Sequence, residues 1–329
     1  MAILVTGGAG YIGSHMSWRL ADQQEKVVVL DNLSTGFQGL VPPAVKLIEG
    51  DIGDRDLVGK VLREEDIEAV IHFAGSIVVP ESVSDPLKYY ENNTVKSRNL
   101  IEACVKAKVD KFIFSSTATV YGEPDLGQLD EELPLLPINP YATSKVMTEW
   151  MLRDVALAHD FRYIAIRYFN VAGADPQGRS GQSSKNATHL IKVASQVALG
   201  EREKLQVFGT DYDTPDGTCI RDYVHVTDLI SAHMDGLTYL RDGGASVAAN
   251  CGYGHGYSVF DVINALNTVI GEEIPVEITE RRPGDAQSLV AKPEKIKSLF
   301  GWKPQHDDLE FVVKTALDWE RSLPDRNWY

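Results

Sequence analysis

Residues 2–13 read Ala-Ile-Leu-Val-Thr-Gly-Gly-Ala-Gly-Tyr-Ile-Gly, an apolar strand that runs directly into the pattern Gly7-x-x-Gly10-x-x-Gly13. In a strand-loop-helix unit with this spacing, the first glycine permits a tight turn and the second lets the backbone approach a pyrophosphate. The third lets the following helix lie close to the sheet, so that the helix N-terminus faces the phosphates. The stretch therefore predicts a dinucleotide-binding βαβ unit at the start of the chain.

Asp31 closes the next apolar strand, residues 27–30. A carboxylate at this position binds the adenosine ribose hydroxyls and repels a 2′-phosphate, so the expected cofactor is NAD rather than NADP. A glycine-rich turn with a purely structural role is the alternative. The order of strand, loop, helix and second strand favours the cofactor site.

Further along, short apolar runs bounded by turns alternate with longer helical stretches. We expect strands at residues 45–48, 69–73, 111–115 and 163–167, and helices at 54–65, 87–107 and 140–159. This alternation is typical of a parallel sheet with helices on both faces. The predicted fold class is α/β, a Rossmann-type doubly wound parallel sheet, whose ligands bind at the carboxyl ends of the strands.

A chain of 329 residues exceeds the usual size of a single core, so two structural parts are expected. We assign residues 1–170 to the sheet domain and 171–329 to a smaller, substrate-facing part. The second part has looser patterning, with helices expected near 189–199, 259–269 and 309–321. One strand near 247–250 is expected to return to the sheet.

The composition limits the classes of partner and the cellular compartment. Lys and Arg number 32 against 47 Asp and Glu, a net charge of −15 that argues against nucleic acid and anionic membranes as partners. The three cysteines are widely spaced, which indicates neither a disulfide framework nor a zinc site, and no histidine cluster resembles a metal site. No segment has the length and apolarity of a membrane span, and no signal peptide precedes the first strand, so a cytoplasmic location is expected.

A second constellation, Tyr141-Ala-Thr-Ser-Lys145, begins the helix expected at 140–159. Residues four apart share one helix face, so the phenol and the ammonium can point into the same cleft. A nearby cation favours the phenolate, which can take the proton of a sugar hydroxyl while hydride leaves the same carbon. Thr117, at the end of the strand expected at 111–115, can hold the substrate oxygen. A solvated helix face is the alternative for the Tyr-Lys pair.

Several further motifs accompany these two sites. They are Asp31-Asn32-Leu33-Ser34, Glu49-Gly50-Asp51-Ile52, His72-Phe73-Ala74-Gly75, Phe114-Ser115-Ser116-Thr117, Arg167-Tyr168-Phe169-Asn170, Arg221-Asp222-Tyr223 and Arg281-Arg282-Pro283-Gly284-Asp285. Together they resemble the extended short-chain dehydrogenase/reductases, and within them the UDP-glucose 4-epimerase branch. The resemblance runs nearly from end to end of the chain.

The resemblance implies a redox-neutral isomerase with tightly bound NAD that interconverts UDP-glucose and UDP-galactose. Tyr141, assisted by Thr117, would deprotonate the 4-hydroxyl, and hydride would leave C4 for the nicotinamide. The 4-keto sugar would turn over in the pocket before hydride returns to its opposite face. Lys145 would hold the nicotinamide ribose and lower the pKa of Tyr141. The 171–329 part would bind the nucleotide sugar.

The resemblance also assigns the binding residues. Those expected at NAD are Gly7, Gly10, Tyr11, Ile12, Gly13, Asp31, Asn32, Leu33, Ser34, Thr35, Gly36, Asp51, Ile52, Phe73, Ala74, Gly75, Ser76, Asn92, Ser115, Tyr141, Lys145, Tyr168 and Phe169. Those expected at the UDP-sugar are Thr117, Tyr141, Asn170, His189, Leu190, Gln206, Val207, Phe208, Arg221, Arg282, Asp285 and Leu289. For Arg221 and Arg282 the alternative is an ordinary surface ion pair.

Two positions depart from the family pattern. Ile77 stands where many relatives have a lysine close to the nicotinamide and the diphosphate. Leu289 stands where some relatives have a tyrosine beside the C2 substituent of the sugar, so the smaller side chain leaves room for an N-acetyl group. Because Ile77 is uncharged, Lys145 and the arginines must supply the positive charge near the nicotinamide and the diphosphate.

Other functions stay open at this point. UDP-N-acetylglucosamine and UDP-glucuronate 4-epimerases share most of these motifs. A 4,6-dehydratase would carry an acidic pair after Thr117, where this chain has Ala118-Thr119. A catalytically inactive NAD sensor would have lost Tyr141 or Lys145. The family often forms homodimers, for which the helices at 90–107 and 142–159 are the expected contact.

Overall fold

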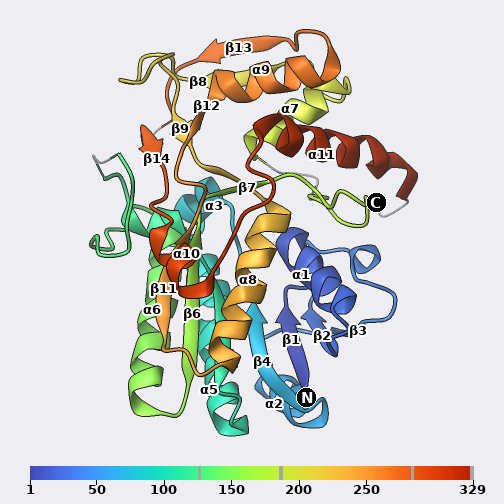
Figure 1. The fold of residues 1–329 in the computed structure, drawn as a ribbon, viewed down its shortest axis with the longest axis vertical. Helices are drawn as coiled ribbons and strands as arrows, with labels where there is room; N and C mark the ends of the chain where they lie inside the picture. Colours follow the sequence, from blue (N-terminus) through green and yellow to red (C-terminus); the bar gives the residue numbers. More distant parts are fainter. Residues whose placement is uncertain (125–126, 185–187, 283–284, 327–329) are drawn as a thin grey trace.

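The computed structural model describes residues 1–329 except 125–126, 185–187, 283–284 and 327–329. Its centre is a seven-stranded parallel sheet with the order β11-β6-β5-β4-β1-β2-β3 (Figure 1). The strands are β1 (Ala2–Thr6), β2 (Val27–Asp31), β3 (Lys46–Glu49), β4 (Ile67–His72), β5 (Lys111–Thr117), β6 (Arg162–Tyr168) and β11 (Val247–Cys251). The order reverses between β1 and β4, which is where such sheets bind ligands. The predicted doubly wound α/β fold is confirmed.

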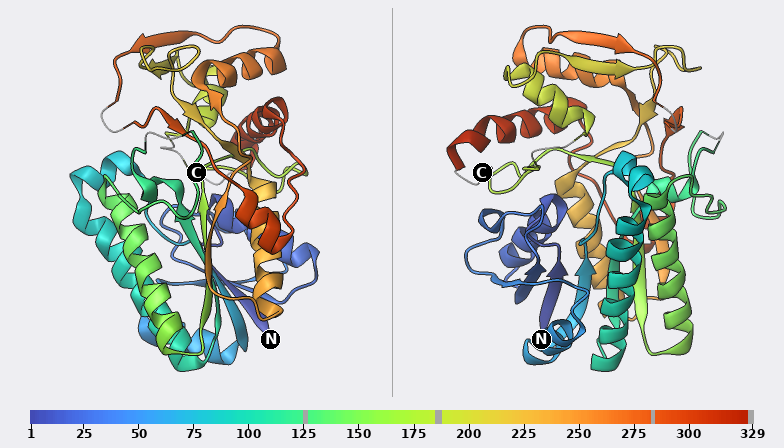
Figure 2. Two further views of the ribbon diagram at one scale, coloured as in Figure 1. Left: turned by 60° about the vertical axis from the view of Figure 1, so that its left-hand side comes forward. Right: turned by 180° about the vertical axis from the view of Figure 1, so that it is seen from behind.

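Helices cover both faces of the sheet because successive residues of each strand point to opposite sides. In β1, Ile3 and Val5 join one apolar cluster, while Ala2 and Leu4 join the other. Figure 2 shows the sheet between these two layers. One layer holds α1 (Tyr11–Asp22), α8 (Val226–Arg241) and α10 (Glu294–Phe300), and the other holds α2 (Arg55–Glu64), α5 (Lys96–Ala107) and α6 (Pro140–Ala158).

The single helix expected at 87–107 is divided in the structure. It consists of α4 (Pro86–Tyr89), a π-helical segment η2 (Tyr90–Val95) and α5. Asn93 lies in η2 with only 2% of its surface exposed, and its backbone carbonyl accepts a hydrogen bond from the hydroxyl of Thr148 in α6 at 3.0 Å. Such wide turns occur often at functional sites. Apolar spacing alone does not distinguish them from a regular helix.

Two elements from the second half of the chain return to the sheet. Strand β11 pairs in parallel with β6, with Val247 opposite Ile164, close to the strand expected at 247–250. Helix α8 was not predicted, although its Leu229 and Leu237 are fully buried in the core beneath the sheet. His233 is also fully buried, so a polar residue stands on the buried face of the helix. It interrupts the apolar periodicity by which a helix is predicted from sequence.

The remainder of the second half forms a smaller layered unit, drawn at the top of Figure 1. Its apolar core joins α7 (Leu190–Ala198), α9 (Val259–Ile270), α11 (Leu309–Ser322) and β8 (Leu205–Phe208), which pairs with β13 (Val276–Thr279). Short strands connect it to the sheet. They are β7 (Asn170–Ala172) with β10 (Tyr223–His225), and β9 (Ile220–Arg221) between β12 (Tyr257–Ser258) and β14 (Ser288–Leu289).

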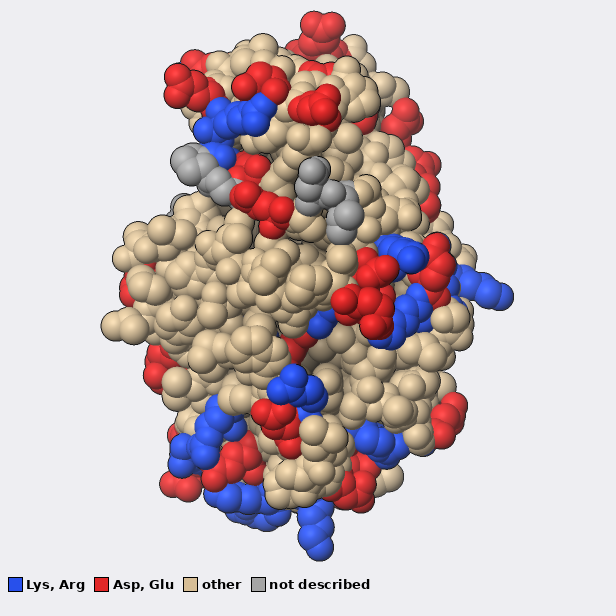
Figure 3. Space-filling model, turned by 90° about the vertical axis from the view of Figure 1, so that its left-hand side faces the viewer, with Lys and Arg blue, Asp and Glu red and all other residues tan. Residues whose placement is uncertain are grey.

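Three more short helices, α3 (Val79–Ser84), η1 (Gln38–Leu40) and η3 (Ala118–Tyr121), lie in connections. Among the described residues, no helix has the length and apolarity needed to cross a membrane. The same residues contain no group of three His, Cys, Asp or Glu side chains that could hold a metal ion. Figure 3 shows one side of the surface, where a wide area carries neither acidic nor basic side chains.

Candidate active site

The glycine loop between β1 and α1 leaves no room for side chains at two of its positions. Gly7 has a φ of +69°, and a Cβ atom there would lie 2.6 Å from the backbone nitrogen of Ala74. A Cβ at Gly13 would lie 2.2 Å from the carbonyl oxygen of Gly7. Both neighbours are backbone atoms that cannot turn away. The first turn of α1 therefore packs directly on the loop, with its N-terminus at the carboxyl edge of the sheet.

The side chains of Tyr11 and Ile12 point away from this loop. The Tyr11 hydroxyl donates to the carbonyl of Gly173 at 2.6 Å, and Ile12 packs against the apolar core of the sheet. At the helix N-terminus the two residues therefore expose main-chain groups rather than side chains. Sequence reasoning placed them at NAD without distinguishing side chain from main chain.

Asp31 lies at the end of β2 with 8% of its surface exposed. Its Oδ2 accepts a hydrogen bond from the backbone N–H of Ala9 at 2.9 Å, and its Oδ1 accepts one from Leu33 at 2.8 Å. These bonds fix the carboxylate beside the glycine loop. Asn32 donates to the carboxylate of Asp51 at 3.2 Å, so the ends of β2 and β3 form one polar edge.

The segment after β4 is held by two asparagines of η2. The amide nitrogen of Asn92 donates to the Ser76 hydroxyl at 3.0 Å. Asn93 bonds both main-chain groups of Ser76, accepting from its N–H at 2.7 Å and donating to its carbonyl at 2.9 Å. Sequence analysis missed Asn93, whose role depends on contacts distant in sequence. This arrangement positions Phe73, Ala74 and Gly75 opposite the glycine loop.

Tyr141, Lys145 and Thr117 come together at the carboxyl end of β5. Tyr141 is 7% exposed, Lys145 3% and Thr117 6%. The Lys145 ammonium donates to the carbonyl of Ser115 at 2.8 Å and lies 6.0 Å from the centre of the Tyr141 ring. Tyr141 shares a side-chain hydrogen bond with Thr117. The Ser115 hydroxyl is hydrogen-bonded to the hydroxyl of Tyr168 at the end of β6.

Burial dominates the electrostatics of this pair. Burial raises the pKa of Tyr141 to about 12, and the hydrogen bond with Thr117 acts in the opposite direction. Burial lowers the pKa of Lys145 to about 8, against the attraction of the Glu149 carboxylate. The sequence predicted a lowered phenol pKa beside the ammonium. In the structure desolvation has the larger effect, because both groups lie deep in the site.

A basic and acidic cluster lies above the sheet edge. The Arg282 Nε donates to Asp285 at 2.9 Å, and the Arg221 guanidinium lies 4.0 Å from the same carboxylate. The Arg282 guanidinium also lies over the ring of Phe208, 4.5 Å from its centre. The two arginines, Asp285 and Phe208, all predicted to contact the UDP-sugar, therefore lie in one group. The intervening positions 283 and 284 of that motif lie outside the described residues.

Leu289 connects this cluster with the catalytic end of β5. Within the parallel pair of β14 and β9 it is the register partner of Arg221. Its side chain packs against the apolar cluster that contains Ala118, the residue after Thr117. A side chain at position 289 thus lies between the arginine cluster and the strand end that carries the catalytic hydroxyl.

Asn170, His189 and Leu190 line one pocket between β7 and α7. The amide nitrogen of Gln182 donates to the Nδ1 of His189 at 2.8 Å. The Val207 side chain is fully buried, so only its backbone can meet a ligand. The Gln206 amide donates to Glu277 at 3.3 Å on an exposed surface.

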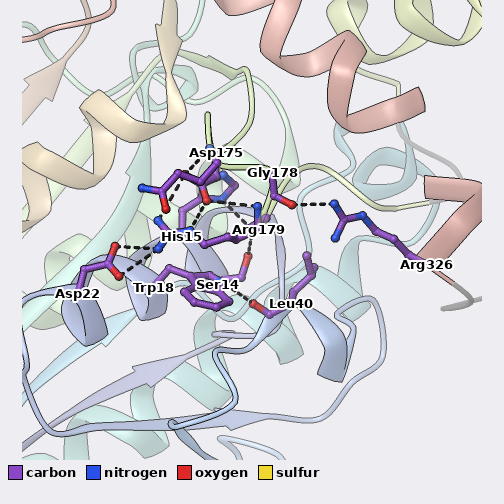
Figure 4. A network of polar contacts seen from close by, with 11 residues as sticks. Ser14, His15, Trp18, Asp22, Leu40, Asp175, Gly178, Arg179 and Arg326 are labelled. Carbon is purple, nitrogen blue, oxygen red and sulfur yellow. Dashed lines mark hydrogen bonds and ion pairs between the residues drawn. The ribbon is translucent and has the colours of Figure 1, made fainter. Parts of the chain in front are cut away.

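A polar network fastens the segment after β7 onto α1 (Figure 4). The hydroxyls of Ser14 and Ser180 lie 2.6 Å apart, and both are buried. Arg179 donates to both carboxylate oxygens of Asp22 at 3.0 Å and to Asp175 at 2.5 Å. The helix that begins at the glycine loop is therefore joined directly to the chain segment leading to His189.

The residues present fit an NAD molecule. The glycine loop is a cradle that side chains would fill, and a Cβ at Gly36 would lie 2.7 Å from the carbonyl oxygen of Ala9. A helix N-terminus favours phosphate groups. The fixed carboxylate of Asp31 suits ribose hydroxyls. Tyr141 and Lys145 lie across the sheet edge from this cradle, where the nicotinamide half would extend.

The chain is similar to known proteins over nearly its whole length. Residues 3–252 match the model of the NAD dependent epimerase/dehydratase family. A UDP-glucose 4-epimerase from Azospirillum brasilense is 56% identical over 98% of this chain and 92% of that protein. The structure of UDP-glucose 4-epimerase from Brucella ovis in complex with NAD has 42% identity and a TM-score of 0.94, covering 97% of this chain and 98% of that one. The UDP-Glc/GlcNAc 4-epimerase from Campylobacter jejuni has 48% identity and a TM-score of 0.86, covering 98% and 99%.

These similarities extend over both the sheet and the smaller unit, and they confirm the resemblance drawn from the motifs. The chain belongs to the NAD-dependent epimerase/dehydratase family, and within it to the UDP-glucose 4-epimerases.

Proposed function

We propose that this protein interconverts UDP-glucose and UDP-galactose at a site formed by the residues predicted above. The observation that carries the proposal is the burial of Tyr141, Lys145 and Thr117 together at the carboxyl end of β5, opposite the glycine loop. A base, a cation and a hydroxyl in one cleft are what proton removal from a sugar hydroxyl requires. The relatives that carry this activity in their names are similar over nearly the whole chain.

In this mechanism the Tyr141 oxygen takes the proton of the sugar 4-hydroxyl, while Thr117 holds the same oxygen by a hydrogen bond. The Lys145 ammonium, fixed by the Ser115 carbonyl, stabilises the phenolate electrostatically. Bound NAD supplies the oxidant that accepts hydride from C4 and returns it, together with the positive charge of the nicotinamide ring. The low exposure of these residues keeps water from the 4-keto sugar.

The uridine diphosphate is the anchor about which the keto sugar turns. We assign its phosphates to Arg221 and Arg282, whose planar guanidinium groups can each pair two oxygens. Asp285 holds both arginines in position before the substrate arrives. The pocket of Asn170, His189 and Leu190 takes another part of the nucleotide sugar.

The direct test is incubation of the purified protein with UDP-glucose, UDP-N-acetylglucosamine and UDP-glucuronate in parallel, without added NAD. We expect UDP-galactose to accumulate from UDP-glucose with no net change in nicotinamide absorbance, because hydride leaves and returns to C4. Stoichiometric release of NADH would indicate a dehydrogenase instead. An inactive NAD sensor would form no product from any of the three.

A second activity, on UDP-N-acetylglucosamine, is favoured by one position. Leu289 lies between the arginine cluster and Ala118, and its side chain is smaller than the tyrosine expected in some relatives. The protein from Campylobacter jejuni, 48% identical, is described as acting on both UDP-Glc and GlcNAc. We propose that this chain also accepts the N-acetyl sugar.

The two-part organisation belongs to the same proposal. Residues 1–170 would hold NAD and residues 171–329 the nucleotide sugar, with β11 and α8 as the returning elements. The three cysteines are free thiols, and Cys104 and Cys251 are buried, which agrees with a cytoplasmic location. Fractionation of cells expressing the chain would test that location.

We propose a homodimer that forms through α5, α6 and the neighbouring α4. Large apolar side chains are exposed on this surface: Leu87 is 75% exposed, Val95 44%, Met147 37% and Trp150 47%. Helix α6 lies on the side of the molecule seen in Figure 3, where a wide area has no charged residues. Apolar patches of this kind are typical of protein contacts.

Sedimentation equilibrium tests the dimer. The change Trp150→Lys should shift the mass from two chains towards one, because it buries a charge in the contact. The matched control is Ile278→Lys in β13, also an exposed apolar residue at 62%, which should leave the mass unchanged. A parent protein that sediments as a single chain would contradict the proposal.

A further inference from the structure

A buried carboxylate lies one helical turn behind the catalytic lysine. Glu149 follows Lys145 by four residues on α6, so both lie on the same face of the helix. Only 6% of the Glu149 side chain is exposed. One of its oxygens accepts a hydrogen bond from the Ser116 hydroxyl at 2.5 Å. Ser116 stands between Ser115, which holds the Lys145 ammonium, and the catalytic Thr117.

The partner of Glu149 is the guanidinium of Arg167 on β6, of whose side chain 7% is exposed. Arg167 donates to both carboxylate oxygens, with Nη2 at 2.6 Å from one and Nε at 3.0 Å from the other. Its remaining terminal nitrogen donates to the Tyr121 hydroxyl at 2.9 Å, which in turn donates to Asn250 of β11 at 2.7 Å. The network therefore joins α6 to β5, β6 and β11.

Stability alone does not account for such a pair. Desolvating two charges costs about as much as their attraction returns, and well-packed apolar residues are often equally stable in their place. The position of the carboxylate near Lys145 has a more specific effect. Burial lowers the pKa of Lys145 to about 8, and the nearby negative charge acts against that fall.

Lys145 is faced by ionisable groups from three elements. Tyr141 and Glu149 lie on α6, His72 on β4, and Tyr168 on β6, where it is hydrogen-bonded to Ser115. Burial lowers the pKa of His72 to about 3, so its ring is neutral near pH 7. Burial raises the pKa of Tyr168. Glu149, paired with the Arg167 guanidinium, is the carboxylate of this set.

We propose that Glu149 is a positioning residue for the reaction: held by Arg167 and Ser116, it keeps the Lys145 ammonium charged and directed toward Tyr141. The Ser116 bond places the strand end and the helix in register, so the carbonyl of Ser115 meets the ammonium. The negative charge behind Lys145 preserves the cation that the phenolate needs. This inference rests on the proposed epimerase activity.

The first test is Glu149→Gln, which retains the side-chain volume and removes the charge. We expect kcat for UDP-glucose to fall about tenfold or more, with KM changed less than about twofold, because the residue does not touch substrate. The alkaline limb of the kcat–pH profile should move to lower pH by about one unit, since Lys145 loses its proton more easily. A fall in kcat with an unmoved alkaline limb would reduce Glu149 to a structural role and overturn the proposal.

A second readout needs no sugar substrate. Ultraviolet titration of phenolate, taken as the difference between each protein and its Tyr141→Phe version, reports the midpoint of Tyr141 directly. Glu149→Gln should raise that midpoint, because a neutral Lys145 no longer stabilises the phenolate. A raised midpoint in a protein without epimerase activity would refute the proposed function and leave this inference standing. An unchanged midpoint would overturn the inference.

Three variants separate charge from folding. Glu149→Asp retains the charge and should recover the parent alkaline limb. If Glu149→Gln does not fold because Arg167 is left without its partner, the double variant Glu149→Gln/Arg167→Gln removes both charges. The alkaline limb of its kcat–pH profile should still lie at lower pH than that of the parent protein. The control is Glu68→Gln, which breaks an ion pair with Arg241 at the amino end of β4, the opposite end of the sheet from the site, and should leave the limb in place. A parent-like limb in the double variant, or a moved limb in the control, contradicts the proposal.

Discussion

At the scale of single residues, Tyr141 is the general base of the proposed reaction. It is 7% exposed and burial raises its pKa to about 12, so its proton transfer depends on the hydroxyl and ammonium around it. Tyr141→Phe should lower turnover by about a hundredfold or more, the usual scale for loss of a general base. NAD should stay bound, because the ring still packs against Tyr89. Steady-state kinetics and the NAD content of the purified variant check both points, and near-normal turnover would remove the assigned role.

The side chain at position 289 should limit the size of the C2 substituent that the sugar pocket accepts. Leu289→Tyr should lower activity on UDP-N-acetylglucosamine selectively, because a clash in a packed pocket costs about 1–3 kcal/mol, which corresponds to about five- to 150-fold in rate. Turnover of UDP-glucose should change little, since a C2 hydroxyl needs less space. The measurement is the ratio of kcat/KM for the two sugars. Equal losses on both would indicate general damage, and a parent protein inactive on the N-acetyl sugar would refute this role.

At the scale of elements, two helical glycines offer a matched comparison. Gly13 in α1 would place a Cβ 2.2 Å from a backbone oxygen, whereas the nearest atom to a Cβ at Gly59 in α2 is the flexible end of Arg63 at 3.2 Å. Gly59→Ala should stabilise the protein by up to about 1 kcal/mol through helix propensity. Gly13→Ala should lower both the free energy of unfolding and the bound NAD, because α1 must move from the loop. Denaturant unfolding and cofactor content measure these effects, and an equal response at both sites would contradict the argument.

The elements also show why the sequence predicted some of the site and missed the rest. Gly7, Asp31 and Thr117 each stand at the end of an apolar strand, so their common edge follows from the parallel topology. Asn93 could not be found, because its importance comes from Ser76 and Thr148, distant in sequence. Glu149 continues the four-residue spacing of Tyr141 and Lys145, which places all three on one face of α6, but its partners Arg167 and Ser116 lie on other strands.

At the scale of the whole molecule, the two halves of the chain are joined by packing, of which the sequence predicted only the strand that returns to the sheet near residues 247–250. Helix α8 and β11 come from the second half yet complete the sheet, and the Ser14–Ser180 and Arg179–Asp22 contacts join α1 to the segment after β7. Motions of the smaller unit relative to the sheet must therefore act through these contacts. Length and composition predicted two parts, and the apolar run near 247–250 predicted a returning strand, whereas α8 was not predicted from the sequence.

The free energy of unfolding in mild acid should depend on four buried histidines, two in residues 1–170 and two in residues 171–329. Burial lowers the pKa of His72 and His225 to about 3, and of His15 and His233 to about 4, from 6.5 for an exposed ring. The unfolded chain therefore binds more protons than the folded protein below about pH 6.5, and stability falls as pH decreases toward about 4. Each ring contributes a slope of up to about 1.4 kcal/mol per pH unit in that window.

Urea unfolding between about pH 7 and about pH 5 measures this slope, since ordinary carboxylates change little over most of that range. His233→Leu should reduce the slope by about a quarter, because its ring packs against Phe73 and is fully buried. The control is His159→Gln, a change in the exposed residue that caps the C-terminus of α6, which should leave the slope unaltered. Constant stability down to about pH 5 would mean that the buried rings take up protons without unfolding, which their apolar surroundings oppose.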